Sequence, residues 1–246
     1  MAKYILFDTE TTGNQPEDKI IQIGVMVVQS KNDIEVFDEL CSTDIQIKLE
    51  AMEVHNIVPE MLLNKPLCTQ TQGYQKIVEY NNPQNYLIAH NISFDLDMLQ
   101  KEGFENQYTL IDTLRCARHL YPQSPYHRLQ YFRYALELYK NEQKEADKLG
   151  ITIKAHDAIG DVLVMKLFLS KLVEKTKELY PDYNPMEKLA ELTKTPVMIQ
   201  KFRFGKYKGE EIAKVAQTDI GYLQWMRSNM ADLDEDMCYT LDKLIK

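Results

Sequence analysis

The stretch 7–13, which has the sequence Phe-Asp-Thr-Glu-Thr-Thr-Gly, constrains the fold more than any other part of this chain. It follows the apolar run 4–7, whose length and composition are typical of a buried strand. If the strand continues through Glu10, the side chains of Asp8 and Glu10 project from the same face. Two neighbouring carboxylates repel each other, and burying them unpaired is costly. A hard divalent cation such as Mg²⁺ removes that cost, because it binds carboxylate oxygens and keeps several waters.

On its own, such a tripeptide is more often a strand that ends in a solvated acidic turn, so later residues decide. Asp95 follows a predicted strand at 86–89 and lies in the first turn of a predicted helix. His156, Asp157 and Asp161 stand at the start of the last long helix. Each has a simpler interpretation: Asp95 as an acid that complements the helix dipole, Asp157 as a helix cap, and His156 as a solvated side chain.

Alternating strand and helix patterns predict an α/β protein with a mixed sheet covered by helices. We expect strands at 3–8, 20–28, 34–40, 86–89 and 108–111. We expect helices at 49–63, 70–80, 93–102, 113–149 and 157–179. Ser93 is the expected N-cap of its helix, and Pro122 and Pro125 are expected to interrupt the fourth helix.

A proline-bounded segment, Pro181-Asp182-Tyr183-Asn184-Pro185, ends the last long helix and marks a boundary. We therefore expect a large domain over 1–180, a linker over 181–197 that contains a short helix, and a small C-terminal α+β module over 198–246. The module begins with a pattern that predicts a hairpin or strand and turn, and helical pattern follows it to the end.

The start of the C-terminal module interleaves aromatic and basic residues. Arg203, Lys206 and Lys208 alternate with three aromatic side chains, namely Phe202, Phe204 and Tyr207. Non-specific nucleic-acid binding uses such patterns, because bases stack on rings while cations contact phosphates. The alternative is that the aromatic residues fill the core of the module and the lysines stay solvated. Net charge does not decide, since residues 198–246 contain eight basic and eight acidic residues.

The net charge of −8 argues against a general nucleic-acid coat protein, but it allows an enzyme that holds a few nucleotides. Charges are unevenly distributed along the chain. Residues 113–136 contain four arginines, two histidines and no acid. This segment is either a basic helix face that balances acids elsewhere or a phosphate-facing rim beside the acidic site.

Several features bear on location. No apolar run approaches the roughly 20 residues of a membrane span. The N-terminus reaches Asp8 too soon to hold the apolar region of a signal peptide. The four cysteines lie far apart and form no CxxC pair, a pattern that indicates reduced thiols in a cytoplasm and argues against a disulfide framework or a zinc site.

Three motifs in order resemble those of the DEDDh (DnaQ-like) 3′–5′ exonucleases, a family that includes the proofreading subunit of a bacterial replicative DNA polymerase. The motifs are FDTETTG at 7–13, AHNISFD at 89–95 and HDAIGD at 156–161. The resemblance covers about residues 1–175. Residues 202–229 further resemble the C-terminal module of exodeoxyribonuclease-X-like proteins, through a shorter and less specific motif.

The resemblance implies an RNase H-like fold with a five-stranded mixed sheet, the second strand antiparallel to the rest. It also implies that Asp8, Glu10, Asp95 and Asp161 bind two Mg²⁺ or Mn²⁺ ions, which lower the pKa of a water and stabilise the leaving oxygen. His156, which titrates near neutrality, is then expected to accept the proton of that water as general base.

The resemblance also indicates how the substrate is held. The backbone near Thr9 and Thr11 is expected to contact the terminal nucleotide, and Phe94 is expected to stack or wedge against a base. His55 is a candidate contact for the terminal sugar, although a lone histidine is more often structural.

Together these inferences predict a metal-dependent 3′–5′ exonuclease that releases nucleoside 5′-monophosphates from single-stranded 3′ ends, with DNA favoured over RNA. Two alternatives stay open: a non-catalytic nucleic-acid-binding module on the same fold, and an exonuclease of short RNA. A binding remnant has no need for all five motif residues, so their presence favours an enzyme. A DNA polymerase is a candidate partner, and no membrane is expected.

Overall fold

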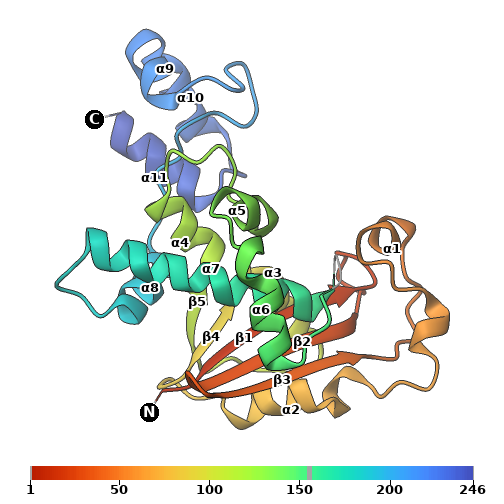
Figure 1. The fold of residues 1–246 in the computed structure, drawn as a ribbon. Coiled ribbons are helices and arrows are strands. Elements are labelled where there is room, and N and C mark those ends of the chain that lie inside the picture. The colour runs from red at the N-terminus through yellow and green to blue at the C-terminus, as the bar shows by residue number, and fades with distance from the viewer. Residues whose placement is uncertain (1, 154–156, 246) are drawn as a thin grey trace.

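The computed structural model describes residues 2–153 and 157–245, and its centre is a five-stranded sheet (Figure 1). The strands are β1 (Tyr4–Thr11), β2 (Ile20–Ser30), β3 (Asp33–Leu40), β4 (Tyr86–Ala89) and β5 (Thr109–Asp112). Their order across the sheet is β3-β2-β1-β4-β5. β2 pairs antiparallel with β1 and β3, whereas β4 pairs parallel with β1 and β5. Among these five strands β2 alone runs against the rest, and the predicted RNase H-like arrangement is confirmed.

Helices surround the sheet and continue into a separate C-terminal lobe (Figure 1). The first group is α1 (Leu49–His55), α2 (Gln72–Glu79), α3 (Ile92–Lys101), α4 (Thr113–Leu120), α5 (Leu129–Ala135) and α6 (Tyr139–Leu149). The second group is α7 (Ala158–Leu179), α8 (Pro185–Lys194), α9 (Ile212–Thr218), α10 (Ile220–Asn229) and α11 (Glu235–Leu244). Two short 3₁₀ turns lie at Pro59–Leu62 and Cys68–Gln70. The predicted break at Pro122 and Pro125 is confirmed, since it separates α4 from α5.

The two faces of the sheet have separate cores because side chains alternate along each strand. Leu6 packs into the core that contains α4 to α8, whereas Ile5 and Phe7 pack with α2 and α3. Asp8 and Glu10 follow Leu6 at intervals of two residues, so they belong to the face that α7 covers. The sheet therefore directs the first two predicted carboxylates toward the helix that carries the last one.

Gly24 of β2 allows the start of α7 to lie directly on the sheet. A Cβ atom at this position would stand 2.6 Å from backbone atoms of both Ala158 and Ile159. Gly24 also pairs with Asp8 across the β1–β2 ladder. The missing side chain is therefore what brings the first turn of α7 beside Asp8.

We expect Gly24→Ala to destabilise the fold by about 1–3 kcal/mol, because the added methyl group meets backbone that cannot rotate away. Turnover should fall as well, since the start of α7 would move relative to β1. Denaturant unfolding and steady-state kinetics measure both effects. Gly221→Ala is the matched control, because a Cβ there meets only one side-chain atom, at 3.8 Å. Parent-like stability and turnover in Gly24→Ala would contradict this account of the packing.

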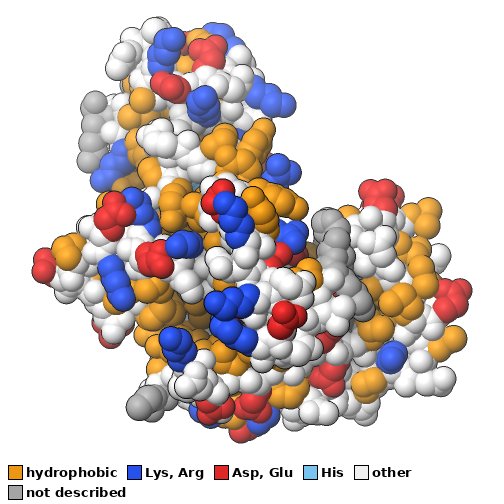
Figure 2. Space-filling model, viewed as in Figure 1, with side chains coloured by type: hydrophobic (Ala, Val, Ile, Leu, Met, Phe, Trp, Pro, Cys, Tyr) orange, Lys and Arg blue, Asp and Glu red, His pale blue; other side chains and the backbone are white. Residues whose placement is uncertain are grey.

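The C-terminal lobe has a hydrophobic core of its own, formed by α9, α10, α11 and the segment before them. Figure 2 shows the lobe projecting from the large domain, with hydrophobic side chains gathered at its base. α8 belongs elsewhere, because its residues Leu189 and Leu192 are part of the core of the large domain. The helix of the predicted linker is thus attached to the large domain, while the boundaries 1–180, 181–197 and 198–246 stay a prediction.

Three local expectations need correction. The cap of α3 is Asn91 in the left-handed conformation, with φ 74° and ψ 51°, so Ser93 lies inside the helix. The segment expected to form a hairpin or a strand and turn is a turn closed by one antiparallel bridge between Lys201 and Glu211. Phe202 is only 2% exposed and Tyr207 packs beside it in the same core. These two rings therefore fill the module, as the alternative interpretation stated.

Two further observations concern location. No described helix is long and apolar enough to cross a lipid bilayer. All four cysteines are free thiols, as their spacing predicted.

Candidate active site

Three elements bring four carboxylates together near the C-terminal end of β1. Asp8 and Glu10 lie on β1, Asp95 lies in the first turn of α3, and Asp161 lies in the first turn of α7. The charges of Asp95, Asp161 and Glu10 all act on Asp8 and raise its pKa. Residues from the three sequence motifs are therefore neighbours in space.

Burial and mutual repulsion both oppose the charged forms of these carboxylates. Burial is the main reason why the pKa of Asp8 is well above its ordinary value. Burial, followed by the charges of Asp161 and Asp95, raises the pKa of Glu10 to about 8. Burial also raises the pKa of Asp95 to about 7, although hydrogen bonds from Thr9 oppose the change. Such a cluster is unfavourable until a cation compensates its charge.

Hydrogen bonds fix the orientation of two of the four carboxylates. The Thr9 hydroxyl donates to Asp95 Oδ1 at 2.7 Å, and Gln130 Nε2 of α5 donates to Asp161 Oδ1 at 2.6 Å. Gln130 could not be recognised from the sequence, because a lone amide in a helix indicates no chemistry before its partner is known. Its position in the acid-free segment 113–136 was the only available signal.

A second amide holds the residue that precedes α7. Gln22 Nε2 on β2 donates to Asp157 Oδ1 and to Asp38 Oδ1, both at 2.7 Å. Asp157 occupies the N-cap position of α7, as the simpler interpretation stated, but its side chain makes no capping bond. The charge of Asp157 instead adds to the negative potential at Glu10. His156, the predicted general base, lies outside the described residues, and its role stays a prediction.

The chemistry of the donor set suits a hard divalent cation, because carboxylate oxygens are the ligands that Mg²⁺ and Mn²⁺ prefer. Within residues 2–153 and 157–245, no three acidic, histidine or cysteine side chains form a ready-made metal-binding group. The raised pKa values of Asp8, Glu10 and Asp95 are the observation that fits a metal site.

A pocket of about 520 Å³ opens beside Glu10, and all four predicted substrate contacts line it. These residues are Thr9, Thr11, His55 and Phe94. Both threonine hydroxyls already donate a hydrogen bond within the protein, Thr9 to Asp95 and Thr11 to the carbonyl of Gly13 at 2.7 Å. The backbone of Thr9 also bonds to Asp95, and that of Thr11 lies beside His55, so their contact with the terminal nucleotide stays a prediction.

His55 has features of both interpretations given above. Its Nδ1 accepts the Ile57 N–H at 2.9 Å, which places the proton on Nε2 and ties the ring to the fold. Nε2 is buried and has no hydrogen-bond partner of good geometry in the described part of the chain, although the Thr11 backbone lies near. Burial lowers the pKa of His55, so the ring is neutral near pH 7. The ring is thus held by Ile57 at the wall of the pocket, and its contact with the terminal sugar stays a prediction.

The loop between β1 and β2 forms another wall of the pocket, and buried Asp18 holds it. Asp18 accepts hydrogen bonds from the Thr12 hydroxyl at 2.8 Å, the Gln15 N–H at 2.7 Å and Lys48 Nζ at 2.6 Å. The pair of Asp18 and Lys48 could not be predicted from the sequence, because the two residues are 30 positions apart and neither belongs to a motif.

We expect Phe94→Ala to raise KM for single-stranded DNA about 10-fold, since stacking of one base contributes about 1–3 kcal/mol. kcat should change less, because the carboxylates stay in place. Phe94→Leu is the control that keeps apolar volume without an aromatic face, and it should be intermediate. Steady-state kinetics and a melting curve for each variant make the measurement. Unchanged KM in a folded Phe94→Ala protein would remove Phe94 from the substrate site.

Comparison with known families agrees with this geometry. The Exonuclease family model matches residues 5–168, and the Exodeoxyribonuclease X-like C-terminal model matches residues 202–230. The chain therefore belongs to the exonuclease family, as its motifs predicted. It is a 3′–5′ exonuclease, a hydrolase of phosphodiester bonds.

Two curated relatives illustrate the similarity. Exodeoxyribonuclease 10 of Escherichia coli (strain K12) is 26% identical over 240 residues, which cover 96% of both chains. DNA polymerase III subunit epsilon of Treponema pallidum is 28% identical over 184 residues, which cover 71% of this chain and 79% of the relative.

Solved structures share the fold. Exonuclease X in complex with 5′ overhanging duplex DNA superposes with a TM-score of 0.53 at 20% identity, covering 77% of this chain and 99% of that chain. Escherichia coli exonuclease I in complex with a dT13 oligonucleotide has a TM-score of 0.53 at 19% identity, covering 74% of this chain and 43% of that chain.

Proposed function

We propose that this exonuclease releases nucleoside 5′-monophosphates from single-stranded 3′ ends of DNA, with Mg²⁺ or Mn²⁺ as cofactor. The observation that carries the proposal is the meeting of four oxygen-donor side chains from β1, α3 and α7 beside the 520 Å³ pocket. A phosphodiester is itself an anion, so it can approach these carboxylates only when cations are present.

The residues of the chain have distinct tasks in this proposal. When bound, the divalent cations supply a water of lowered pKa and offset the charge that develops on the phosphate. Thr9 and Gln130 hold the carboxylates of Asp95 and Asp161 in fixed orientations. Phe94 and the threonine backbone position the terminal nucleotide, and His156 accepts the proton of the attacking water.

DNA is the proposed substrate because the relatives act on or were solved with DNA. The name of Exodeoxyribonuclease 10 describes an enzyme of DNA, and the two structural neighbours above were solved with DNA. The similarity to DNA polymerase III subunit epsilon supports a DNA polymerase as a candidate partner. Binding to a purified replicative polymerase, measured by gel filtration, tests that partnership.

One experiment tests the proposed function. Single-stranded DNA, duplex DNA and RNA of equal length, each labelled at the 5′ end, are incubated with Mg²⁺ and separately with EDTA. We expect a ladder that shortens from the 3′ end of single-stranded DNA, and no reaction in EDTA. Faster degradation of RNA would replace DNA by RNA as the substrate. No degradation of any of the three with Mg²⁺ would contradict the proposal.

A further inference from the structure

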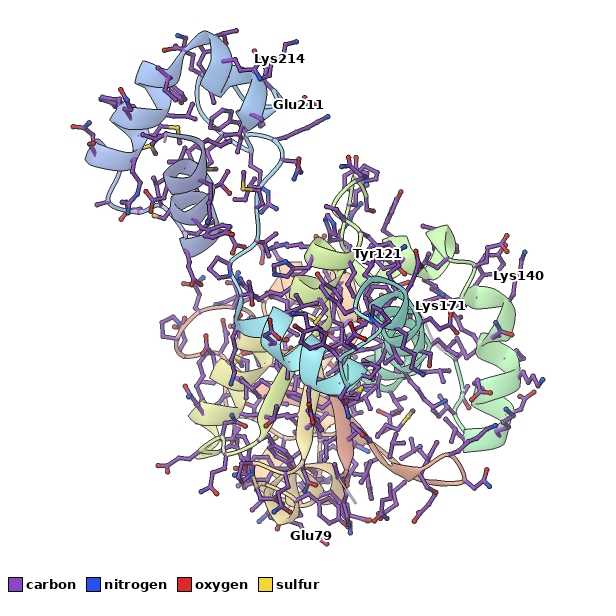
Figure 3. All side chains as sticks on the ribbon, turned by 90° about the vertical axis from the view of Figure 1, so that its left-hand side faces the viewer. Glu79, Tyr121, Lys140, Lys171, Glu211 and Lys214 are labelled. Atoms are coloured by element: carbon purple, nitrogen blue, oxygen red, sulfur yellow. The ribbon has the colours of Figure 1, made fainter. Side chains whose placement is uncertain are left out.

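A second pocket, of about 440 Å³, lies between the large domain and the C-terminal module. The large domain contributes Arg118 of α4 and residues from the loop 121–128. The other side is formed by Val197 of the linker and by the module, which contributes the segment 198–203 together with Glu211 and Asp236. Figure 3 shows the two sides, with Glu211 labelled on the module and Tyr121, which ends α4, labelled on the large domain. We refer to this pocket as the interdomain cleft.

Asp236 joins the two sides of the interdomain cleft. It accepts hydrogen bonds from Arg115 Nη2 at 3.2 Å and from the Val197 N–H at 2.8 Å. Arg115 is fully engaged, because it also donates to the carbonyls of Thr193 and Thr195, both at 2.8 Å. This network fixes the module against α4, and Arg115 already offsets negative charge of Asp236.

Arg118 is left with unsatisfied hydrogen-bonding capacity. Its Nη1 reaches Asp236 Oδ2 only at 3.5 Å, the limit of a hydrogen bond. Its Nε is buried and has no hydrogen-bond partner among the residues the structure describes. A buried N–H in this state has lost its bond to water without a replacement, which is costly.

The cleft also holds more positive than negative charge. Arg118, Lys201 and Arg203 line it, and the lining carboxylates are Glu211 and the already shared Asp236. Burial, followed by the charge of Arg203, lowers the pKa of Arg118, so the two guanidinium groups repel each other. Phosphate oxygens suit such a site, because guanidinium groups bind them through charge-assisted hydrogen bonds.

The four arginines of the basic segment 113–136 have different partners in the structure. Arg133 forms a bidentate pair with Glu142, with both bonds at 2.6 Å, and Arg115 belongs to the Asp236 network. Arg128 stacks over the ring of Tyr126 at 4.9 Å. Arg118 is the arginine of this segment that lines the cleft. Of these four arginines, Arg118 is therefore the candidate for the expected phosphate-facing rim, and it lies where the large domain meets the module.

The cleft and the active site share one short segment. His127 lines the cleft, and Gln130, three residues later, donates to the active-site carboxylate of Asp161. Three residues of chain span at most about 11 Å. A nucleic-acid strand is therefore long enough to reach both places at once.

We propose that the interdomain cleft binds backbone phosphates of the strand whose 3′ end occupies the active site. The proposal rests on the proposed function for the identity of the ligand. Arg118, Lys201 and Arg203 provide the cationic contacts, and Phe202 takes no part, since its ring is buried. Contacts to phosphate alone hold a strand without reading its sequence.

The test compares parent and Arg203→Gln, since Arg203 is exposed and its substitution leaves the Asp236 network intact. Affinity for a 20-nucleotide single strand is measured by fluorescence anisotropy in EDTA at several salt concentrations. We expect about 10-fold weaker binding. The slope of the logarithm of the affinity against the logarithm of the salt concentration should be smaller by about 0.7 for each phosphate that the variant no longer neutralises. Lys214→Gln is the matched control, because Lys214 is an exposed cation of α9 outside the cleft lining. It should bind as the parent does.

A second variant removes negative charge from the cleft and should have the opposite effect on binding. Glu211→Gln removes a carboxylate from the cleft and should tighten strand binding about 3-fold. Glu210→Gln is its control, since the neighbouring Glu210 is exposed and outside the lining. Equal affinities and salt slopes for the parent, Arg203→Gln and Glu211→Gln would overturn the proposal.

Two further arms separate the remaining outcomes. Inorganic phosphate is the first additional probe. If phosphate stabilises the parent but not Arg203→Gln, while both proteins bind the strand equally well, the cleft is a site for free phosphate and the proposal is overturned. With Mg²⁺ present, the loss of kcat/KM in Arg203→Gln should be larger on the 20-nucleotide strand than on a trinucleotide. A parent that degrades no nucleic acid, yet binds strands through Arg203, would contradict the proposed function and leave the cleft assignment standing.

Discussion

Asp8→Asn is expected to lower turnover with Mg²⁺ by about 10³-fold or more, and to raise the melting temperature of the metal-free protein. Turnover falls because an amide is a weaker ligand than a carboxylate and brings no charge to offset that of the cation. Stability rises because Asp8 is repelled by Asp95, Asp161 and Glu10, and a neutral side chain removes that repulsion. Steady-state kinetics with Mg²⁺ and melting curves in EDTA measure the two effects.

The pH dependence of metal-free stability provides an independent readout of the same prediction. A carboxyl group whose pKa is raised by folding stabilises the fold below its ordinary pKa, and this contribution is lost as pH rises through the folded value. Folding raises the pKa of Glu10 to about 8 and that of Asp95 to about 7. The parent in EDTA should therefore lose stability between about pH 5 and about pH 9, and Asp8→Asn should lose less.

The control for this prediction is Asp97→Asn, which removes an exposed carboxylate from α3 two residues after Asp95. It should keep turnover close to that of the parent, and the melting temperature in EDTA should change little. Near-normal turnover of Asp8→Asn with Mg²⁺ would exclude Asp8 as a metal ligand. A lower melting temperature in EDTA would exclude carboxylate repulsion as the dominant force at the site.

The sequence predicted the parts of the site that lie on regular elements. The spacing of Asp8 and Glu10 predicted that they share one face of β1, because strand side chains alternate. The position of Asp95 in the first turn of α3, and of Asp161 in that of α7, followed from helix patterns that begin after a strand or a polar segment. These relations are local, so short stretches of sequence contain them.

The contacts that support the site could not be predicted, because they join distant parts of the chain. Gln130 and Asp161 are 31 residues apart, and Gln22 and Asp157 are 135 residues apart. Gly24 gives no sign in the sequence that α7 packs on it. Such pairs depend on the order of the strands and on which face a helix covers, and both follow from tertiary packing.

The C-terminal module shows a different limit of sequence analysis. Phe202 and Tyr207 alternate with cations, a pattern that both a base-binding surface and a small core produce. The structure assigns them to the core. A module of about 50 residues has little interior, so large aromatic side chains are needed to fill it. Local pattern alone cannot separate these uses, because burial depends on the helices that come later in the chain.

His156→Ala is expected to lower kcat by about 10²–10⁴-fold, the usual contribution of a general base. Metal binding should persist, because the carboxylates of Asp8, Glu10 and Asp161 are untouched. Its sequence neighbour Asp157 is held by Gln22 and acts on Glu10, so Asp157 itself adjoins the site. Stopped-assay kinetics measure turnover, and the shift in melting temperature on adding Mg²⁺ measures metal binding.

The pH–rate profile distinguishes a general base from a structural histidine. In the parent, kcat/KM should rise with pH through the histidine range near about 6.5, because only the neutral imidazole accepts a proton. His156→Ala should lack this rise, and added imidazole should restore part of its rate by replacing the missing base. His156→Gln is the size-matched control, which should be as slow as His156→Ala and less responsive to imidazole. If the variant kept the rise with pH, or lost its response to Mg²⁺ in the melting curve, His156 would hold the structure of the site and would not accept the proton.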